Sequence, residues 1–293
     1  MSATTITFDD RLAAKSTASV NTRASALWRD RRAIIGATIL LILLVSALAG
    51  PALRQLDPNR LDLASAGAPP SVGHPLGTDE SGRDVLARIF AGGRVSLAVG
   101  FAAMLVSVGL GTILGSLAGM KGGWIDSFLM RLTDAVLSIP TIFVVICVLT
   151  FLGPSIPTLV IAIGTTSWMS LARLVRGELF SIRELPFAEA ATALGERPLQ
   201  LFVRHLLPHL WPAVLVNATI GVGTAILTES ALSFLGLGVQ PPAASWGNML
   251  SGAQSYLFTY PWLAIYPGAM IMLTVVAINL LGDAFADRWH PTS

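Results

Sequence analysis

Charged residues and cysteine are both scarce in this sequence. Charged residues make up 12% of the 293 residues, whereas hydrophobic residues make up 53%. A soluble globular domain carries roughly twice that fraction of charge, so the composition excludes an ordinary soluble protein. The single cysteine, Cys147, excludes a disulfide within the chain. A formal net charge of +2 is too small to indicate nucleic-acid binding, and we expect no nucleic acid among the partners.

The residue patterns of catalytic and metal sites are missing as well. The sequence contains no G-x-x-x-x-G-K-[ST] phosphate loop and no H-E-x-x-H zinc motif. His205 and His209 have a spacing that two metal ligands could use, but no third ligand lies near them in the sequence. We therefore expect no catalytic residue, no metal site and no cofactor bound by this chain, which argues against a membrane enzyme.

Long apolar runs are what the sequence has in abundance. A helix needs about twenty mostly apolar residues to cross a bilayer, because its backbone groups must hydrogen-bond within the helix. The sequence predicts an all-α membrane protein with six transmembrane helices, and Pro140 predicts a kink in the third. The six segments are 33–53, 95–120, 130–152, a fourth from the turn at 153–157 to about 171, 210–236 and 262–281.

Positively charged residues indicate the orientation. Arginine and lysine are frequent in residues 1–32, whereas residues 239–261 carry no charge at all. Short loops rich in these residues stay in the cytoplasm, and an even number of spans puts both ends on one side, so both termini are predicted to be cytoplasmic. A cleaved signal peptide is the alternative for the first span, because Ala47-Leu48-Ala49 resembles a cleavage site. The predicted organisation is a cytoplasmic tail (1–32), a first transmembrane helix (33–53), a periplasmic loop (54–93), a transmembrane core of five helices (94–283) and a cytoplasmic tail (284–293).

Two glycine patterns predict local structure around the second span. Residues 85–90 have an apolar face and a charged face, which predicts a short interfacial helix that Gly92-Gly93 would end. Gly111, Gly115 and Gly119 recur at four-residue spacing, which predicts a helix face that a neighbouring helix approaches closely. That neighbour belongs either to the same subunit or to a partner.

Residues 172–209 form the longest predicted cytoplasmic loop. Pro186 can start a short helix over 187–194 that Gly195 ends, and Pro198 can start a second helix. Two prolines further along are expected to bend or stop that second helix before the fifth span. Helices this short are not stable alone in water, so we expect the loop to pack against another surface.

The same loop carries a recognisable motif. Glu189-Ala190-Ala191 is followed by Gly195 and then by Leu207-Pro208. This pattern resembles the E-A-A loop in the permease subunits of bacterial ABC importers. The loop's place before the fifth span agrees with the resemblance, although that family usually has an aliphatic residue where this chain has His205.

Further segments resemble the second permease subunit of dipeptide, oligopeptide and nickel importers, and together they cover residues from about 33 to 283. The C-terminus departs from the family, which often ends in an Asp-Pro-Arg stretch where this chain has His290-Pro291-Thr292. The similar segments are His74-Pro75-Leu76-Gly77-Thr78-Asp79, Gly82-Arg83-Asp84, Arg94-Val95-Ser96-Leu97, residues 229–238, Pro241-Pro242, Ser245-Trp246-Gly247 and Gly282-Asp283.

The resemblance implies a type I ABC importer permease fold in the bacterial inner membrane, with a cytoplasmic coupling helix between the fourth and fifth transmembrane helices. The implied partners are a second homologous permease subunit, two ATPase subunits that bind ATP and Mg, and an extracytoplasmic solute-binding protein. The coupling loop, residues 177–209, would contact an ATPase subunit. Its implied coupling residues are Glu189, Ala190, Ala191, Gly195, Leu207 and Pro208. The solute stays open among peptides, nickel chelates, glutathione and opine-like compounds.

A few ionisable residues lie inside the predicted spans. Such groups are costly in a bilayer and usually face a cavity or a partner. Glu229, with Ser230 and Ser233, is therefore a candidate for the translocation pathway, and a structural anchor is the alternative. Arg131 and Asp134 are expected to pair with each other or with neighbours. An ion-coupled secondary transporter remains the alternative function, although the chain has few intramembrane charges and no clear internal repeat.

Overall fold

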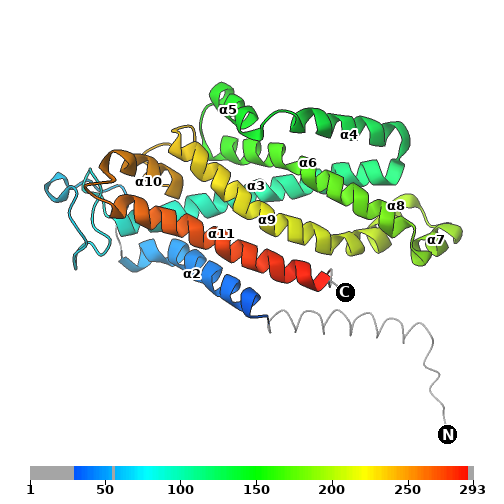
Figure 1. The fold of residues 1–293 in the computed structure, drawn as a ribbon, viewed down its shortest axis with the longest axis horizontal. Coiled ribbons are helices and arrows are strands. Elements are labelled where there is room, and N and C mark those ends of the chain that lie inside the picture. The colour runs from blue at the N-terminus through cyan, green and yellow to red at the C-terminus, as the bar shows by residue number, and fades with distance from the viewer. Residues whose placement is uncertain (1–29, 55–56, 290–293) are drawn as a thin grey trace, which may run out of the picture.

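The computed structural model describes residues 30–54 and 57–289. Within these residues the chain is helical, and its only β-type contact is an isolated bridge between Thr78 and Asp84. Figure 1 shows the long helices lying roughly along one axis, with the 57–84 segment at one end and α7 (Pro186–Ala193) at the other. The predicted all-α class is confirmed. Most of the predicted N-terminal tail and the His290-Pro291-Thr292 segment lie outside the described residues.

Single long helices stand where five of the six spans were predicted, and a bent pair of helices stands at the third. Within the described residues, five helices are long and apolar enough to cross a membrane, and the bent pair α4–α5 makes a sixth if it counts as one span. The helices other than α7 are α2 (Arg31–Arg54), α3 (Val85–Lys121), α4 (Gly123–Leu137), α5 (Thr141–Leu152), α6 (Ile156–Arg183), α8 (Pro198–Leu201), α9 (Leu207–Phe234), α10 (Trp246–Ala253) and α11 (Trp262–Trp289), with short turns at η1 (Leu63–Ser65), η2 (Phe202–Leu206) and η3 (Gln254–Tyr256).

The third predicted span is not one helix. It is broken between α4 and α5, whose axes differ by 84°. Pro140 has no backbone N–H to donate and disfavours helical geometry at Ile139, so the helix ends at this point. The kink predicted at Pro140 is therefore a full break: the helix ends at Leu137 and a second helix begins at Thr141.

The predicted short helix ending at Gly92-Gly93 is also wrong, because α3 runs through both glycines without a break. Because glycine has no side chain, Gly92 and Gly93 instead allow a close contact with Ser245 and Trp246. A Cβ on Gly92 would lie 3.2 Å from the carbonyl carbon of Ser245, and one on Gly93 would lie 3.0 Å from the Trp246 ring. The two glycines therefore let the start of α10 pack directly on α3.

The other glycine pattern lies on the face where α3 packs against α6. A Cβ on Gly115 would lie 2.5 Å from the backbone oxygen of Ala172, and one on Gly111 would lie 2.9 Å from Leu171. Gly119 makes the same kind of approach to Leu179. Of the two alternatives for this seam, packing within the subunit is the one observed. Helix α6 continues without a break to Arg183, well into the predicted cytoplasmic loop.

Helix α2 is tied to α3 through a proline-created gap in its hydrogen bonding. Pro51 has no N–H to donate to the carbonyl of Ala47, four residues earlier. Arg94 of α3 fills this gap, with Nε donating to the Ala47 carbonyl and Nη2 donating to the Leu48 carbonyl, each at 2.6 Å. One guanidinium thus satisfies the Ala47 carbonyl, which lacks its helical donor, and adds a second bond at the Leu48 carbonyl.

The other end of α2 meets the end of α11. Asp30 accepts the backbone N–H of Arg32, a bond that caps the helix and lowers the pKa of the Asp30 carboxyl. Arg32 Nη2 also lies 2.6 Å from Asp287 Oδ2 on α11. The first and last described helices therefore begin and end side by side.

Residues 57–84, within the predicted loop 54–93, form an irregular segment, and polar contacts give it a defined shape. Asp79 accepts the backbone N–H groups of Ser81 and Arg83, and its Oδ2 lies 2.7 Å from Arg83 Nε. Asp84 caps α3 by accepting the Ala87 N–H, and its other oxygen lies 2.8 Å from Nδ1 of His74. The segment is thereby fastened to the first turn of α3.

Candidate functional site

Helix α7 stands beyond the ends of the long helices, where the sequence predicted it. Pro186 occupies its first turn, where a missing N–H is harmless. Gly195 follows with φ of +82°, and no atom of the described residues lies within 4 Å of where its Cβ would be. The positive φ, rather than a close contact, is what requires glycine here. The predicted helix over 187–194 and its glycine stop are confirmed.

The two faces of α7 differ sharply in exposure. Ala188 and Ala191 are buried and pack in a cluster with Leu179 and Ile182 of α6 and with Leu206. Small side chains let α7 lie close against these residues. Glu189, Ala190 and Pro208 are exposed, Gly195 is exposed at the turn, and Leu207 is half-buried. The predicted coupling residues therefore divide into one inward residue, Ala191, and an outward set.

Two exposed leucines extend the outward surface, and the sequence analysis missed them. Leu194 is 86% exposed and Leu199 is 74% exposed, although neither lies in a long apolar helix. Exposed apolar side chains grouped on a polar loop mark interaction surfaces. The signal available in the sequence was the presence of leucines in a segment otherwise rich in charge.

The joint between the loop and the fifth long helix is a π-helical turn, η2. The two prolines expected to bend or stop the chain are Pro208, in the first turn of α9, and Pro212, inside α9. The chain does not stop, because α8, η2 and α9 follow one another without a break. The wider π turn, in which the Leu207 N–H donates to the Phe202 carbonyl, accommodates the missing proline donors.

Side-chain contacts fasten this end of the molecule. His205 Nε2 lies 3.3 Å from Glu196 Oε1, and the His209 ring stacks on Phe187 with centroids 4.7 Å apart. Arg183 donates to the Gly119 carbonyl at the end of α3 across 2.7 Å. Within the described residues, no three His, Cys, Asp or Glu side chains come together as a metal site.

Ion pairs join α4 to α6. Asp126 accepts from Arg176 Nη2 at 2.6 Å, and Asp134 pairs with Arg173. Of the two alternatives for Asp134, a neighbouring helix supplies its partner, not Arg131. Ion pairs therefore hold α4, the first half of the broken third span, on α6.

Glu229 lies at the centre of a buried polar cluster. Its side chain is fully buried, and it accepts from Ser96 Oγ at 2.9 Å, from Ser233 Oγ at 2.7 Å and from Ser230 Oγ at 3.4 Å. Ser96 Oγ also accepts the backbone N–H of Trp246 at 3.2 Å. This cluster joins α3, α9 and the start of α10, which favours the structural alternative for Glu229, Ser230 and Ser233.

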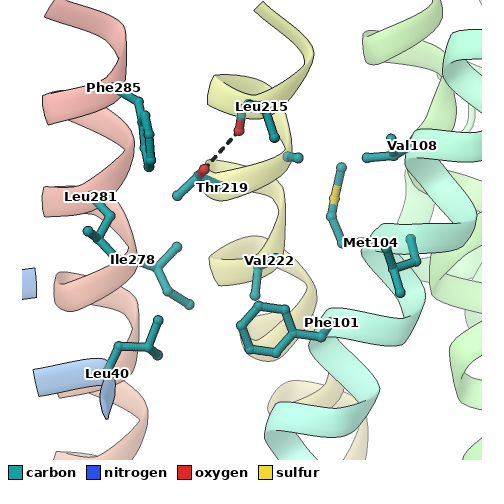
Figure 2. A pocket seen from close by; sticks show the side chains of 12 residues that line it. Leu40, Phe101, Met104, Val108, Leu215, Thr219, Val222, Ile278, Leu281 and Phe285 are labelled. Carbon is teal, nitrogen blue, oxygen red and sulfur yellow. Dashed lines mark hydrogen bonds between the residues drawn. The ribbon is translucent and has the colours of Figure 1, made fainter. Parts of the chain in front are cut away.

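An apolar groove of about 330 Å³ lies between α3, α9 and α11, with Leu40 of α2 at one side. Figure 2 shows Phe101 and Met104 facing Ile278 and Leu281 across it. Its one polar side chain, Thr219, donates to its own helix at the Leu215 carbonyl, 2.8 Å away. With no free donor to offer a solute, this groove fits hydrocarbon.

A second cavity, of about 320 Å³, lies between α6, α9 and the α4–α5 break, and we refer to it as the polar cavity. Met104 lines both spaces and so separates the polar cavity from the apolar groove. This site was not predictable from the sequence, because its hydroxyls are dispersed over α5, α6 and α9. Its polar lining residues are Thr141, Thr166, Ser167, Ser170, Asn217, Thr224 and Thr228.

Comparison with known proteins identifies the family. The model of the family "Binding-protein-dependent transport system inner membrane component" matches residues 111–292. The chain is 40% identical over 266 residues to the dipeptide transport system permease protein DppC of Bacillus subtilis, covering 90% of this chain and 83% of that protein. It is 37% identical to the oligopeptide transport system permease protein OppC of Escherichia coli, with 91% of each chain covered.

A solved structure shares the fold. Inward-facing conformations of the MetNI methionine ABC transporter match with a TM-score of 0.54 at 20% identity, covering 68% of this chain and 94% of that chain. At this identity the likeness concerns the arrangement of helices alone. The chain belongs to the family of binding-protein-dependent transport system inner membrane components, and it is a permease subunit of an ATP-driven ABC importer, with the type I permease fold, in the dipeptide and oligopeptide permease class.

Proposed function

We propose that this permease subunit forms half of a translocation path for peptides. Its relatives are named as dipeptide and oligopeptide permeases, and the similarity spans nearly the whole chain. The other half of the path comes from a second homologous permease subunit, and an extracytoplasmic solute-binding protein delivers the peptide. Two ATPase subunits bind ATP and Mg and hydrolyse the nucleotide, so this chain has no catalytic residue of its own.

The observation that carries the proposal is the two-faced α7. Ala188 and Ala191 lie in a buried cluster with residues of α6 and of the start of α9, and Phe187 stacks on His209 of α9, whereas Glu189, Ala190 and Leu194 are exposed. An ATPase subunit that binds the outer face and moves would therefore move α6 and α9 with it. Both helices line the polar cavity, so motion at α7 is transmitted to the path.

The proposed membrane orientation rests on a contact between the first and last described helices. The Arg32–Asp287 pair places the start of α2 beside the end of α11, which agrees with both termini on one side of the membrane. The basic residues near the N-terminus favour the cytoplasm for that side. Residues 57–84 and α10 then face the periplasm and the solute-binding protein.

A matched pair of leucines tests the coupling surface. Leu194→Asp should abolish co-purification of the ATPase subunits from native membranes and the ATP hydrolysis that accompanies them. Leu63→Asp is the control, since Leu63 is 77% exposed at the opposite end. Equal retention of ATPase by both variants would contradict coupling through α7. Transport by this chain alone in proteoliposomes, driven by an ion gradient, would instead support the secondary-transporter alternative.

The same two positions test orientation. Cys147 is replaced by alanine, so that a single cysteine at position 194 or 63 can be labelled. A membrane-impermeant maleimide should label position 194 only after the membrane is opened and position 63 in intact spheroplasts. The reverse pattern would place α7 outside and overturn the proposed topology.

A further inference from the structure

The polar cavity offers the hydrogen-bonding groups that a peptide backbone needs and no charge. We infer that it is the part of the path that binds the backbone of a passing peptide, and that it passes acidic, neutral and basic peptides alike. This inference rests on the proposed function and assigns it a site.

Three side chains in the cavity lack partners within the chain. Among residues 30–54 and 57–289, no hydrogen bond reaches the side chain of Asn217, Ser170 or Thr141. In a bilayer such groups need water or another polar partner, because an unpaired polar group in hydrocarbon costs several kcal/mol, ~2–7 by transfer scales. The cavity is therefore built to hold something polar.

Other hydroxyls in the lining provide acceptors. Ser167 donates to the Ile163 carbonyl at 2.8 Å, and Thr228 donates to the Thr224 carbonyl at 2.9 Å. A hydroxyl that donates its hydrogen to its own helix still has oxygen lone pairs that can accept a hydrogen bond from a ligand. The lining thus presents acceptors for peptide N–H groups, and the amide of Asn217 presents both a donor and an acceptor for a peptide bond.

The break between α4 and α5 opens onto the same space. Leu137 and Thr141, on either side of the break, both line the cavity, and residues 138–140 between them are exposed. Figure 1 places this break beside the middle of α6. Non-helical backbone at membrane depth is stable where protein covers it or where it faces water. Its exposure therefore indicates an aqueous space at this depth.

Among the residues that the structure describes, no side chain that lines the cavity is charged. Glu229 follows Thr228 directly, but its carboxylate is fully buried among the serines of its cluster and does not face the cavity. Asp134 and Arg173, on the helices next to the cavity, pair with each other. The volume of about 320 Å³ lies within the range of small-molecule sites, roughly 300–1,000 Å³.

The first experiment tests whether the space is aqueous. Single cysteines are placed at Ser170 and at Thr165 in a Cys147→Ala chain within the assembled importer. Both residues are exposed on α6, but only Ser170 lines the cavity. A small charged methanethiosulfonate reacts with a thiolate, which forms in water and not in lipid. We expect Ser170→Cys to react at least about tenfold faster than Thr165→Cys; equal rates would overturn the aqueous cavity.

The second experiment tests charge-indifferent binding. The importer is reconstituted with its binding protein, loaded with a random mixture of di- and tripeptides, and the imported peptides are identified by mass spectrometry. Asn217→Asp, which keeps the side-chain size, should reduce import of acidic peptides about tenfold relative to basic ones, because a carboxylate then stands in the path. Thr165→Asp is the control outside the lining and should leave that ratio unchanged.

The outcomes separate the two proposals. ATP-dependent import of peptides by the wild-type complex, with a ratio shifted only by Asn217→Asp, supports the cavity as the binding site. Import that Asn217→Asp leaves unchanged, or lowers equally for all peptides, overturns the cavity assignment while leaving the proposed function standing. Absence of any ATP-dependent peptide import by the wild-type complex overturns the proposed function itself.

Discussion

Ser96 of α3 donates its hydroxyl hydrogen to Oε2 of Glu229 on α9 across 2.9 Å, while its oxygen accepts the backbone N–H of Trp246. One hydroxyl therefore links three helices. The bond also leaves Glu229 dependent on hydroxyl donors, since the serines around it are the only partners recorded for its carboxylate in the described part of the chain.

Ser96→Ala should lower the thermal midpoint of the purified protein in detergent. The substitution leaves a buried carboxylate oxygen and a buried N–H without this partner, which costs about 1–3 kcal/mol. Ser107→Ala is a matched control on the same helix, because Ser107 is equally buried but its side chain has no hydrogen-bond partner in the described part of the chain. A midpoint that falls equally in both variants would show that the cluster does not stabilise the fold.

Gly115→Ala should separate α3 from α6. The new Cβ would stand 2.5 Å from the Ala172 carbonyl oxygen, so the helices must shift at a cost of about 1–3 kcal/mol. Gly109→Ala on α3 meets no atom within 4 Å and should be neutral or stabilising, because alanine favours a helix by up to about 1 kcal/mol. Unfolding midpoints measured side by side check this, and a harmless Gly115→Ala would refute the close approach.

Arg94→Lys should loosen α2 although the charge is kept. Lysine cannot present two fixed donors to the carbonyls of Ala47 and Leu48, and the lost bonds cost about 2 kcal/mol. Hydrogen–deuterium exchange in residues 40–50 should rise, whereas Arg131→Lys, at an exposed position, should leave that exchange unchanged. Unaltered exchange in Arg94→Lys would mean that packing alone holds α2.

Gly195→Ala should uncouple ATP hydrolysis from transport. A side chain at φ of +82° costs about 1–2 kcal/mol, and the strain is relieved by turning the end of α7 away from its present position. Peptides imported per ATP should fall several-fold while the complex still hydrolyses ATP. Gly177→Ala, at an open helical position in α6, provides the comparison. Unchanged coupling in Gly195→Ala would show that the turn geometry is not required.

Features that depend on neighbouring residues in the chain were predictable from the sequence. The short helix α7, its proline start and its Gly195 stop follow from backbone chemistry within ten or so residues, and so do the long apolar helices. The family pattern in 189–208 lies in one such local stretch. Pro140 likewise predicted a distortion of the third span. A missing backbone N–H does not specify the angle between the helices on either side.

Features that depend on distant residues were not predictable in the same way. Gly92-Gly93 looked like a helix stop, because a glycine pair ends a helix unless another segment covers it, and here α10 does so from more than 150 residues away. Asp134 found its partner on another helix for the same reason.

The sequence by itself determined the membrane class, most of the long helices, the helical loop at 186–209 and the family, because these depend on composition and on contacts along the chain. Only the tertiary structure decided that Glu229 is buried among serines and that Asn217, Ser170 and Thr141 meet around one cavity. Helix periodicity tells which residues share a face of one helix, but it does not tell which helix that face will meet. The packing of α5, α6 and α9 determines which helix faces meet, and it thereby brings these polar side chains to one cavity.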